Sequence, residues 1–200
     1  MSEQELMSEN QSLSLNPNVS VDCVVFGFDL SGLKVLLIER DNPDNTTGKN
    51  FQLPGDLIRN NENLDEAANR VLKELTGLND LYLEQFSAFG DPSRVTREND
   101  LEWLRSVRKD PEARVVTIGY FSLIKPENFK PAANSFARKA EWVHVDNVPE
   151  LAFDHNIILK DGLKALKLKM RSEPVGFELL PEKFTLGQLQ NLYETVMGFE

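Results

Sequence analysis

One segment constrains the fold of this chain more than any other. It covers residues 53–78 and reads LPGDLIRNNENLDEAANRVLKELTGL. Asn63 is a favourable N-cap, Glu66 follows three residues later as its capping-box partner, and Gly77 supplies a left-handed C-cap. The segment therefore predicts a capped helix that follows a short strand, FQLPG, halted by its proline and glycine.

Composition sets the class of protein. A chain of 200 residues with 40 % hydrophobic and 27 % charged residues can bury one good core and a small appended module. The net charge of −10 argues against a polyanion-binding surface over the whole molecule, although a local basic patch stays open. The single cysteine, Cys23, excludes an intrachain disulfide and fits a reducing cytoplasm. The sequence contains no apolar run of about 18 residues, so we expect no membrane-spanning helix.

The remaining elements follow from periodicity. Residues 1–18 are polar, lack the pattern of a signal peptide, and predict a flexible tail. Residues 19–172 alternate strands with two helices and predict one α/β layered domain. A short second unit is expected over residues 173–200, with a strand VGFELL and a helix between Thr185 as cap and Gly198 as stop. The printed chain ends soon after that helix.

The 53–78 segment, with its preceding strand, resembles the Nudix box. That pattern is glycine, five residues, glutamate, seven residues, then Arg-Glu-apolar-x-Glu-Glu-x-Gly-apolar. The resemblance implies a Nudix-like α/β/α sandwich with a mixed sheet. The matching positions are Glu62, Arg70, Leu72, Glu74, Gly77 and Leu78.

Three positions depart from this pattern. Val71 and Leu75 occupy two of the three clustered glutamate positions, and Asp56 replaces the first glycine. In the family these glutamates hold divalent ions, which need oxygen ligands to neutralise the charge that develops on phosphate. Because Glu74 alone cannot anchor a metal cluster, we expect no catalytic residues, no metal site and no diphosphate hydrolysis.

An alternative keeps hydrolysis open. Val71 and Leu75 could be core residues of an active hydrolase whose metal ligands come from elsewhere, such as Glu98 or Glu112. Asp56 points the other way, because its charge should repel phosphate while its oxygens accept hydrogen bonds from an uncharged sugar. An aspartate that merely faces solvent is the simpler interpretation of that position.

Three further stretches resemble a subgroup of the family. FGDPSR at 89–94 and LAFDHNIIL at 151–159 look like the Nudix-like domains of bacterial transcriptional regulators. LLPEKFTLGQLQNLYETVMG at 179–198 resembles the opening of their C-terminal winged helix. The resemblance implies a homodimeric regulator that binds a DNA operator and an effector, without a cofactor. The DNA-binding unit is expected to be incomplete, because no basic recognition helix follows.

The resemblance leaves two effectors open. One branch of these regulators binds ADP-ribose and governs NAD metabolism. Another, in gut Bacteroidetes, resembles this sequence more closely and answers to L-arabinose. The altered box and Asp56 favour the sugar branch, so we expect a regulator of carbohydrate utilisation that senses L-arabinose.

Six polar residues are candidates for the effector pocket. Arg40 ends one strand and Gln52 begins the approach to the box, so both can face a cleft. Asp91 and Arg94 lie in a turn after a strand, a usual place for ligand groups, although Asp91 can instead cap its turn. His155 either contacts the ligand or packs locally at a helix start. The predicted set is Arg40, Gln52, Asp56, Asp91, Arg94 and His155.

Overall fold

The computed structural model describes residues 14–29, 32–40, 51–95, 97–128, 131–132, 135, 137–176, 179–180 and 183–198. Within them, seven strands form one mixed sheet in the order β3-β2-β1-β6-β5, with β4 paired to β1 and β7 paired to β2. β1 and β6 run parallel, and the other pairs are antiparallel. The strands are β1 Leu15–Asp29, β2 Gly32–Arg40, β3 Phe51–Gln52, β4 Gly55–Arg59, β5 Glu84–Phe89, β6 Val116–Ile124 and β7 Ala137–His144.

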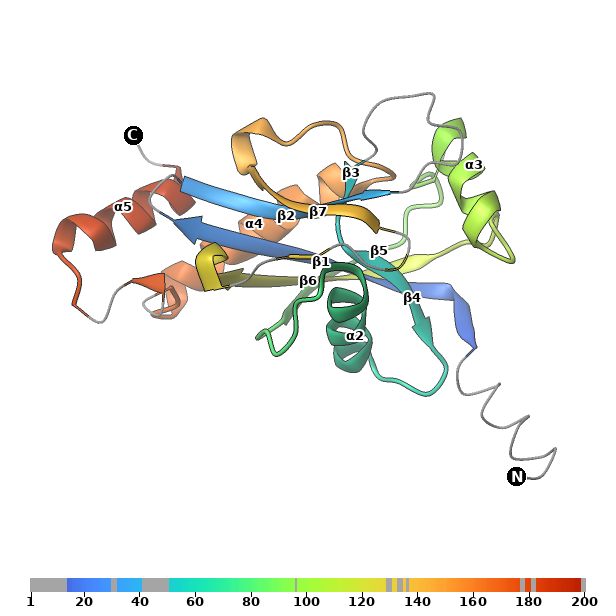
Figure 1. Ribbon diagram of the computed structural model, residues 1–200, viewed down its shortest axis with the longest axis horizontal. Coiled ribbons are helices and arrows are strands. Elements are labelled where there is room, and N and C mark those ends of the chain that lie inside the picture. Colours follow the sequence, from blue (N-terminus) through green and yellow to red (C-terminus); the bar gives the residue numbers. More distant parts are fainter. Residues whose placement is uncertain are drawn as a thin grey trace.

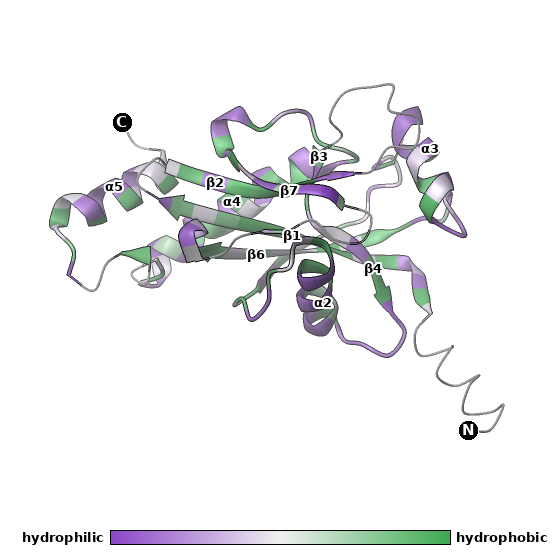
Figure 2. Cartoon of the chain, in the orientation of Figure 1, coloured by the Kyte–Doolittle hydropathy of each residue, from purple (hydrophilic) through white to green (hydrophobic). Residues whose placement is uncertain are grey.

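Helices cover both faces of this sheet. In Figure 1, α2 (Leu64–Thr76) lies in front of the strands and α4 (His155–Ser172) lies behind them. Side chains alternate along β1, so Val21 and Val25 join the cluster under α2, whereas Val24 and Phe26 join the cluster under α4. In Figure 2, β1 and β2 carry long hydrophobic stretches, whereas α2 mixes hydrophilic and hydrophobic residues. The predicted α/β/α sandwich is confirmed.

Two shorter helices lie at opposite ends of the sheet. α3 (Glu98–Val107) and α5 (Leu186–Met197) flank it in Figure 1. α5 begins at the predicted cap Thr185 and ends at Gly198, whose φ is +72°. Its Leu192 and Val196 are buried in the cluster that α4 shares, so this helix packs directly on the core of the main domain. Short 3-10 turns occur at Pro126–Asn128 and Val145–Asn147.

The observed elements correct two predictions and add one strand that was not predicted. β1 begins at Leu15, inside the predicted tail, because its first residues pair with β4 (Leu15 opposite Arg59). β4 itself was not predicted. The expected strand VGFELL is wrong where it is described, because Gly176 turns the chain at φ +91° and Leu179 follows in a 3-10 turn. Residues 1–13 and 41–50 lie outside the described residues.

No helix in the described ranges is both long enough and apolar enough to cross a bilayer.

Candidate functional site

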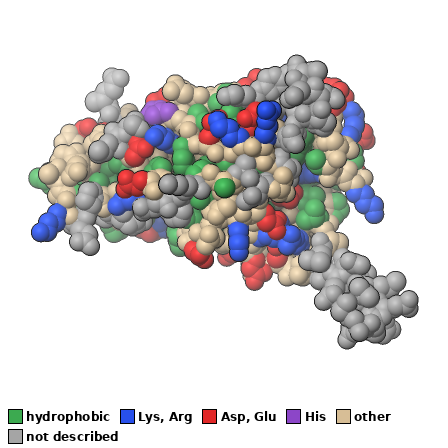
Figure 3. Space-filling view, in the orientation of Figure 1, with side chains coloured by type: hydrophobic (Ala, Val, Ile, Leu, Met, Phe, Trp, Pro, Cys, Tyr) green, Lys and Arg blue, Asp and Glu red, His purple; other side chains and the backbone are tan. Residues whose placement is uncertain are grey.

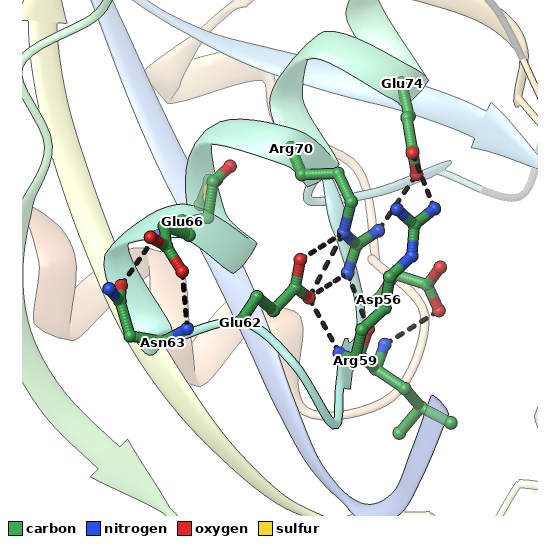
Figure 4. A network of polar contacts seen from close by, with 10 residues as sticks. Asp56, Arg59, Glu62, Asn63, Glu66, Arg70 and Glu74 are labelled. Carbon is green, nitrogen blue, oxygen red and sulfur yellow. Dashed lines mark hydrogen bonds and ion pairs between the residues drawn. The ribbon is translucent and has the colours of Figure 1, made fainter. Parts of the chain in front are cut away.

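The box segment is held together by an ion network. Arg70 Nη2 lies 2.6 Å from Glu62 Oε1 and also donates to the Leu57 carbonyl at 2.9 Å. Arg70 Nη1 lies 2.9 Å from Glu74 Oε2, and Arg59 reaches the other oxygen of Glu74 at 2.8 Å. Figure 4 shows these side chains converging between the box loop and the helix. The network ties β4 to α2.

The two substituted glutamate positions are core positions. Val71 is 0 % exposed and Leu75 is 2 % exposed, and both belong to the cluster between α2 and the sheet. Glu74 instead lies at the edge of the helix, where the two arginines hold it. The three positions therefore differ in exposure, since Glu74 is 41 % exposed while the other two are buried. The aliphatic pair seals the sheet and leaves Glu74 outside it.

The alternative metal ligands do not gather at the box. Glu98 lies on α3 and pairs with Arg105 at 2.9 Å, and Glu112 is exposed. Among the residues that the structure describes, no group of three His, Cys, Asp or Glu side chains is placed to hold a metal ion.

A cavity of about 870 Å³ opens at the α3 end of the sheet. This size falls within the range of small-molecule sites, about 300–1,000 Å³. Asp22 of β1, Gln52 of β3 and His155 of α4 are buried at its floor, whereas Arg108 and Lys109 follow α3 at its rim. Four of the six predicted pocket residues line the cavity, namely Gln52, Asp56, Arg94 and His155.

The floor centres on a buried carboxylate, Asp22. Its Oδ2 accepts a hydrogen bond from Thr117 Oγ1 at 2.7 Å and lies 3.6 Å from Arg94 Nη2. His155 Nδ1 accepts from the Leu53 amide at 3.0 Å, so its Nε2 carries the proton and faces Asp22 Oδ1 at 3.4 Å. Burial lowers the pKa of His155 despite the opposing charge of Asp22, so this imidazole is neutral at pH 7.

The backbone next to this carboxylate has no room for a side chain. Gly55 lies opposite Asp22 in the β1–β4 pair, and a Cβ at Gly55 would lie 1.8 Å from Asp22 Oδ1. Glycine is therefore required for the carboxylate to keep its position. Sequence reasoning missed Asp22 because it stands inside the apolar run VDCVVFGF, where only the strand pairing reveals its neighbours.

The two arginines of the cavity differ in their partners. Arg94 is bound to Asp154 by two hydrogen bonds of 2.9 and 2.8 Å, so it positions the start of α4. Arg108 makes no hydrogen bond or ion pair with any residue in the described ranges. Burial lowers the pKa of Arg108, although Asp56 and Asp22 oppose this effect. Arg108 is thus a partly buried cation available to an anion, and the sequence offered no signal that singled it out.

The other two predicted pocket residues lie elsewhere. Arg40 is 3 % exposed and stacks against Trp103 and Phe153, with its Cζ 4.7 and 5.1 Å from the two ring centroids. Arg40 also pairs with Asp100 at 2.9 Å. Because it stacks on Trp103 and Phe153, which line the cavity, it lies behind this aromatic wall. Asp91 is exposed outside the cavity and caps its own turn, accepting hydrogen bonds from the amide and hydroxyl of Ser93 at 2.7 and 2.6 Å.

Asp56 lies at the cavity as expected. Burial raises the pKa of Asp56, and its Oδ1 accepts a hydrogen bond from the Leu57 amide at 2.7 Å, as Figure 4 shows. The carboxylate is therefore partly engaged with its own backbone.

Two domain signatures match this chain. The NUDIX domain matches residues 16–163, and the NrtR DNA-binding winged helix domain matches residues 176–200. The chain therefore belongs to the Nudix family. The second match, to α5 and its flanks, places it close to the NrtR-type regulators.

Individual relatives agree with this placement. The chain is 32 % identical over 204 residues to the "ADPR responsive transcriptional repressor NtrR" of Acinetobacter baylyi, covering 98 % of this chain and 74 % of that protein. It is 31 % identical to the "ADP-ribose pyrophosphatase" of Methanocaldococcus jannaschii, covering 76 % of each. The NUDIX domain of Shewanella oneidensis NrtR, solved with ADP ribose, is 25 % identical with a TM-score of 0.60, covering 83 % of this chain and 99 % of that one.

Proposed function

We propose that this protein is a DNA-binding transcriptional regulator whose Nudix domain senses ADP-ribose in the cavity beside α3. The observation that carries the proposal is Arg108, a cation at the cavity that makes no hydrogen bond or ion pair with any residue in the described ranges. A diphosphate supplies the negative charge that such a cation needs. Lys109 adjoins it at the same rim. The repressor relative and the ADP-ribose complex support the same ligand.

This proposal corrects the earlier preference for L-arabinose, which finds no support in the relatives. The preference rested on Asp56, whose charge was expected to repel phosphate. Asp56 is partly engaged with the Leu57 amide, and its remaining lone pairs can accept the hydroxyls of a ribose as readily as those of a free pentose. Asp56 therefore does not separate the two ligands, whereas Arg108, which has no hydrogen bond or ion pair in the described part of the chain, favours the charged one.

We further propose that the domain binds ADP-ribose without hydrolysing it. Val71 and Leu75 are buried in the core, and Glu74 is held by Arg59 and Arg70. Catalysis of diphosphate hydrolysis in this family needs several carboxylates around divalent ions. The pyrophosphatase relative keeps hydrolysis as the alternative to be tested.

One helix joins the cavity to the DNA-binding unit. α4 begins with His155 at the cavity floor and extends over 18 residues, about 27 Å. Towards its far end, Lys167 Nζ donates to the Met197 carbonyl at the end of α5, at 3.0 Å. A ligand that shifts the start of α4 can therefore act on the first helix of the winged-helix region. Acidic and basic side chains are interspersed on the face that Figure 3 shows. Contact with DNA therefore depends on a local group of basic side chains and not on the charge of the whole face.

Calorimetric titration tests the effector assignment. We expect saturable binding of ADP-ribose and no heat with L-arabinose. Arg108→Gln should weaken ADP-ribose binding by about tenfold or more, because a hydrogen bond to a charged group contributes about 1.5–3 kcal/mol. Arg105→Gln is the matched control, since Arg105 carries the same charge on α3 but pairs with Glu98 away from the cavity. Binding of L-arabinose without ADP-ribose would contradict the proposal.

A further inference from the structure

The cavity has two chemically different ends. At the floor, Asp22, Gln52 and His155 are 4 %, 2 % and 3 % exposed. At the rim, Arg108 and Lys109 provide two positive charges and Asp110 one negative charge, and Val107 is an exposed apolar side chain. A ligand with a charged part and an uncharged polar part therefore has a preferred direction in this cavity.

The floor is built to accept hydrogen bonds. The carbonyl oxygen of the Gln52 amide is buried and has no hydrogen-bond partner in the described part of the chain. Leaving such an acceptor unpaired costs about 1–3 kcal/mol, so a ligand that donates to it gains affinity. Asp22 lines the same cavity and accepts a hydrogen bond at Oδ2, and among the described residues its Oδ1 has the long 3.4 Å contact with His155.

A sugar fits these acceptors and a phosphate does not. Hydroxyl groups donate hydrogen bonds, whereas phosphate oxygens offer acceptors and negative charge, which Asp22 repels. Trp103 and Phe153 line the same cavity and give the carbon-bound face of a sugar an apolar wall. The phosphate requirement is met instead at the rim by Arg108, whose guanidinium makes no hydrogen bond or ion pair with any described residue.

Resting on the proposed function, we propose that ADP-ribose enters with its terminal ribose first. Gln52 and Asp22 read the hydroxyls of that ribose, and Arg108 holds the diphosphate at the rim. The protein then distinguishes ADP-ribose from ADP by the sugar and not by charge. ADP carries at least as much negative charge as ADP-ribose, so a site that read charge alone would bind ADP at least as tightly.

Calorimetry with ADP-ribose and ADP on three proteins tests this orientation. The unmodified protein should bind ADP-ribose at least about tenfold more tightly than ADP, since a net hydrogen bond contributes about 0.5–1.5 kcal/mol and several are expected. Gln52→Leu should weaken ADP-ribose by about tenfold and leave ADP unchanged. Arg108→Gln should weaken both ligands by a similar factor. Gln52→Leu removes an unpaired buried oxygen, so its thermal unfolding should match or exceed that of the unmodified protein.

The outcomes separate the two proposals. Equal affinity for ADP and ADP-ribose in the unmodified protein would overturn the orientation while the effector assignment stands. So would a Gln52→Leu protein that loses affinity for both ligands equally. Absence of any ADP-ribose binding by the unmodified protein would overturn the proposed function itself. The comparison of ligands on the unmodified protein does not depend on either variant folding.

Discussion

Replacing Val71 with glutamate returns a carboxylate to a position where the Nudix pattern has one. In this protein the side chain at that position is 0 % exposed and packed between α2 and the sheet. The change loses the burial of one valine, about 1.5–3 kcal/mol, and places a carboxyl group in an apolar site at a cost of several kcal/mol more. A total of about 4–7 kcal/mol is a large part of the 5–15 kcal/mol that stabilises a typical domain.

Urea unfolding followed by circular dichroism measures this effect. We expect the midpoint for Val71→Glu to fall sharply, or the variant to be unfolded without denaturant. Asn69→Glu is the matched control, because Asn69 is exposed on the same helix, and its change should stay within about 0.5 kcal/mol. A Val71→Glu protein with unaltered stability and a gained magnesium-dependent hydrolysis would refute the assignment of this position to the core.

Three further perturbations have defined outcomes. Asp100→Leu should cost about 3–5 kcal/mol in urea unfolding, because it strands the guanidinium of Arg40 in a site where both side chains are at most 3 % exposed. Gly55→Ala should cost about 1–3 kcal/mol and weaken ADP-ribose binding, because its Cβ would lie 1.8 Å from the floor carboxylate. Arg70→Gln should raise the pH of acid unfolding. Burial by itself would raise the pKa of Glu62, but Arg70 holds that pKa below its ordinary value. The stability that this ion pair contributes is therefore fully present above about pH 4.3 and is lost as the pH falls through the lowered pKa. An unchanged acid transition in Arg70→Gln would contradict this role.

Local chemistry explains which elements could be predicted from the sequence. The helix boundaries at Asn63 and Gly77 rest on capping groups that act within a few residues. β4 was missed because residues 55–59 lack strand alternation and are held by pairing with β1, which is distant in sequence. The first residues of β1 were missed for the same reason. Propensity carries no information about such a partner.

The same distinction applies to the site. Gln52, Asp56, Arg94 and His155 were predicted as pocket residues from their chemistry and their places near a strand, the box, a turn and a helix start, and the structure brings them together. The prediction for Arg40 was wrong because the sequence around a polar residue at a strand end does not show whether its side chain faces a cleft or a buried partner. In this protein the partner is Asp100.

Arg108 escaped notice for a related reason. It follows a charged helix whose other arginines pair with neighbouring carboxylates, so its lack of a partner in the described ranges is visible only in three dimensions. A cation that is partly buried without a protein partner points to a ligand more directly than any residue type does alone.

Titration of ADP-ribose into the protein with magnesium present, followed by calorimetry, tests the central claim most directly. Heat from binding saturates, whereas heat from turnover continues until the ligand is consumed. We predict saturable heat for a single class of site, with no continuing signal. Sustained heat that disappears when magnesium is chelated, or no heat at all, would contradict a domain that senses ADP-ribose without cleaving it.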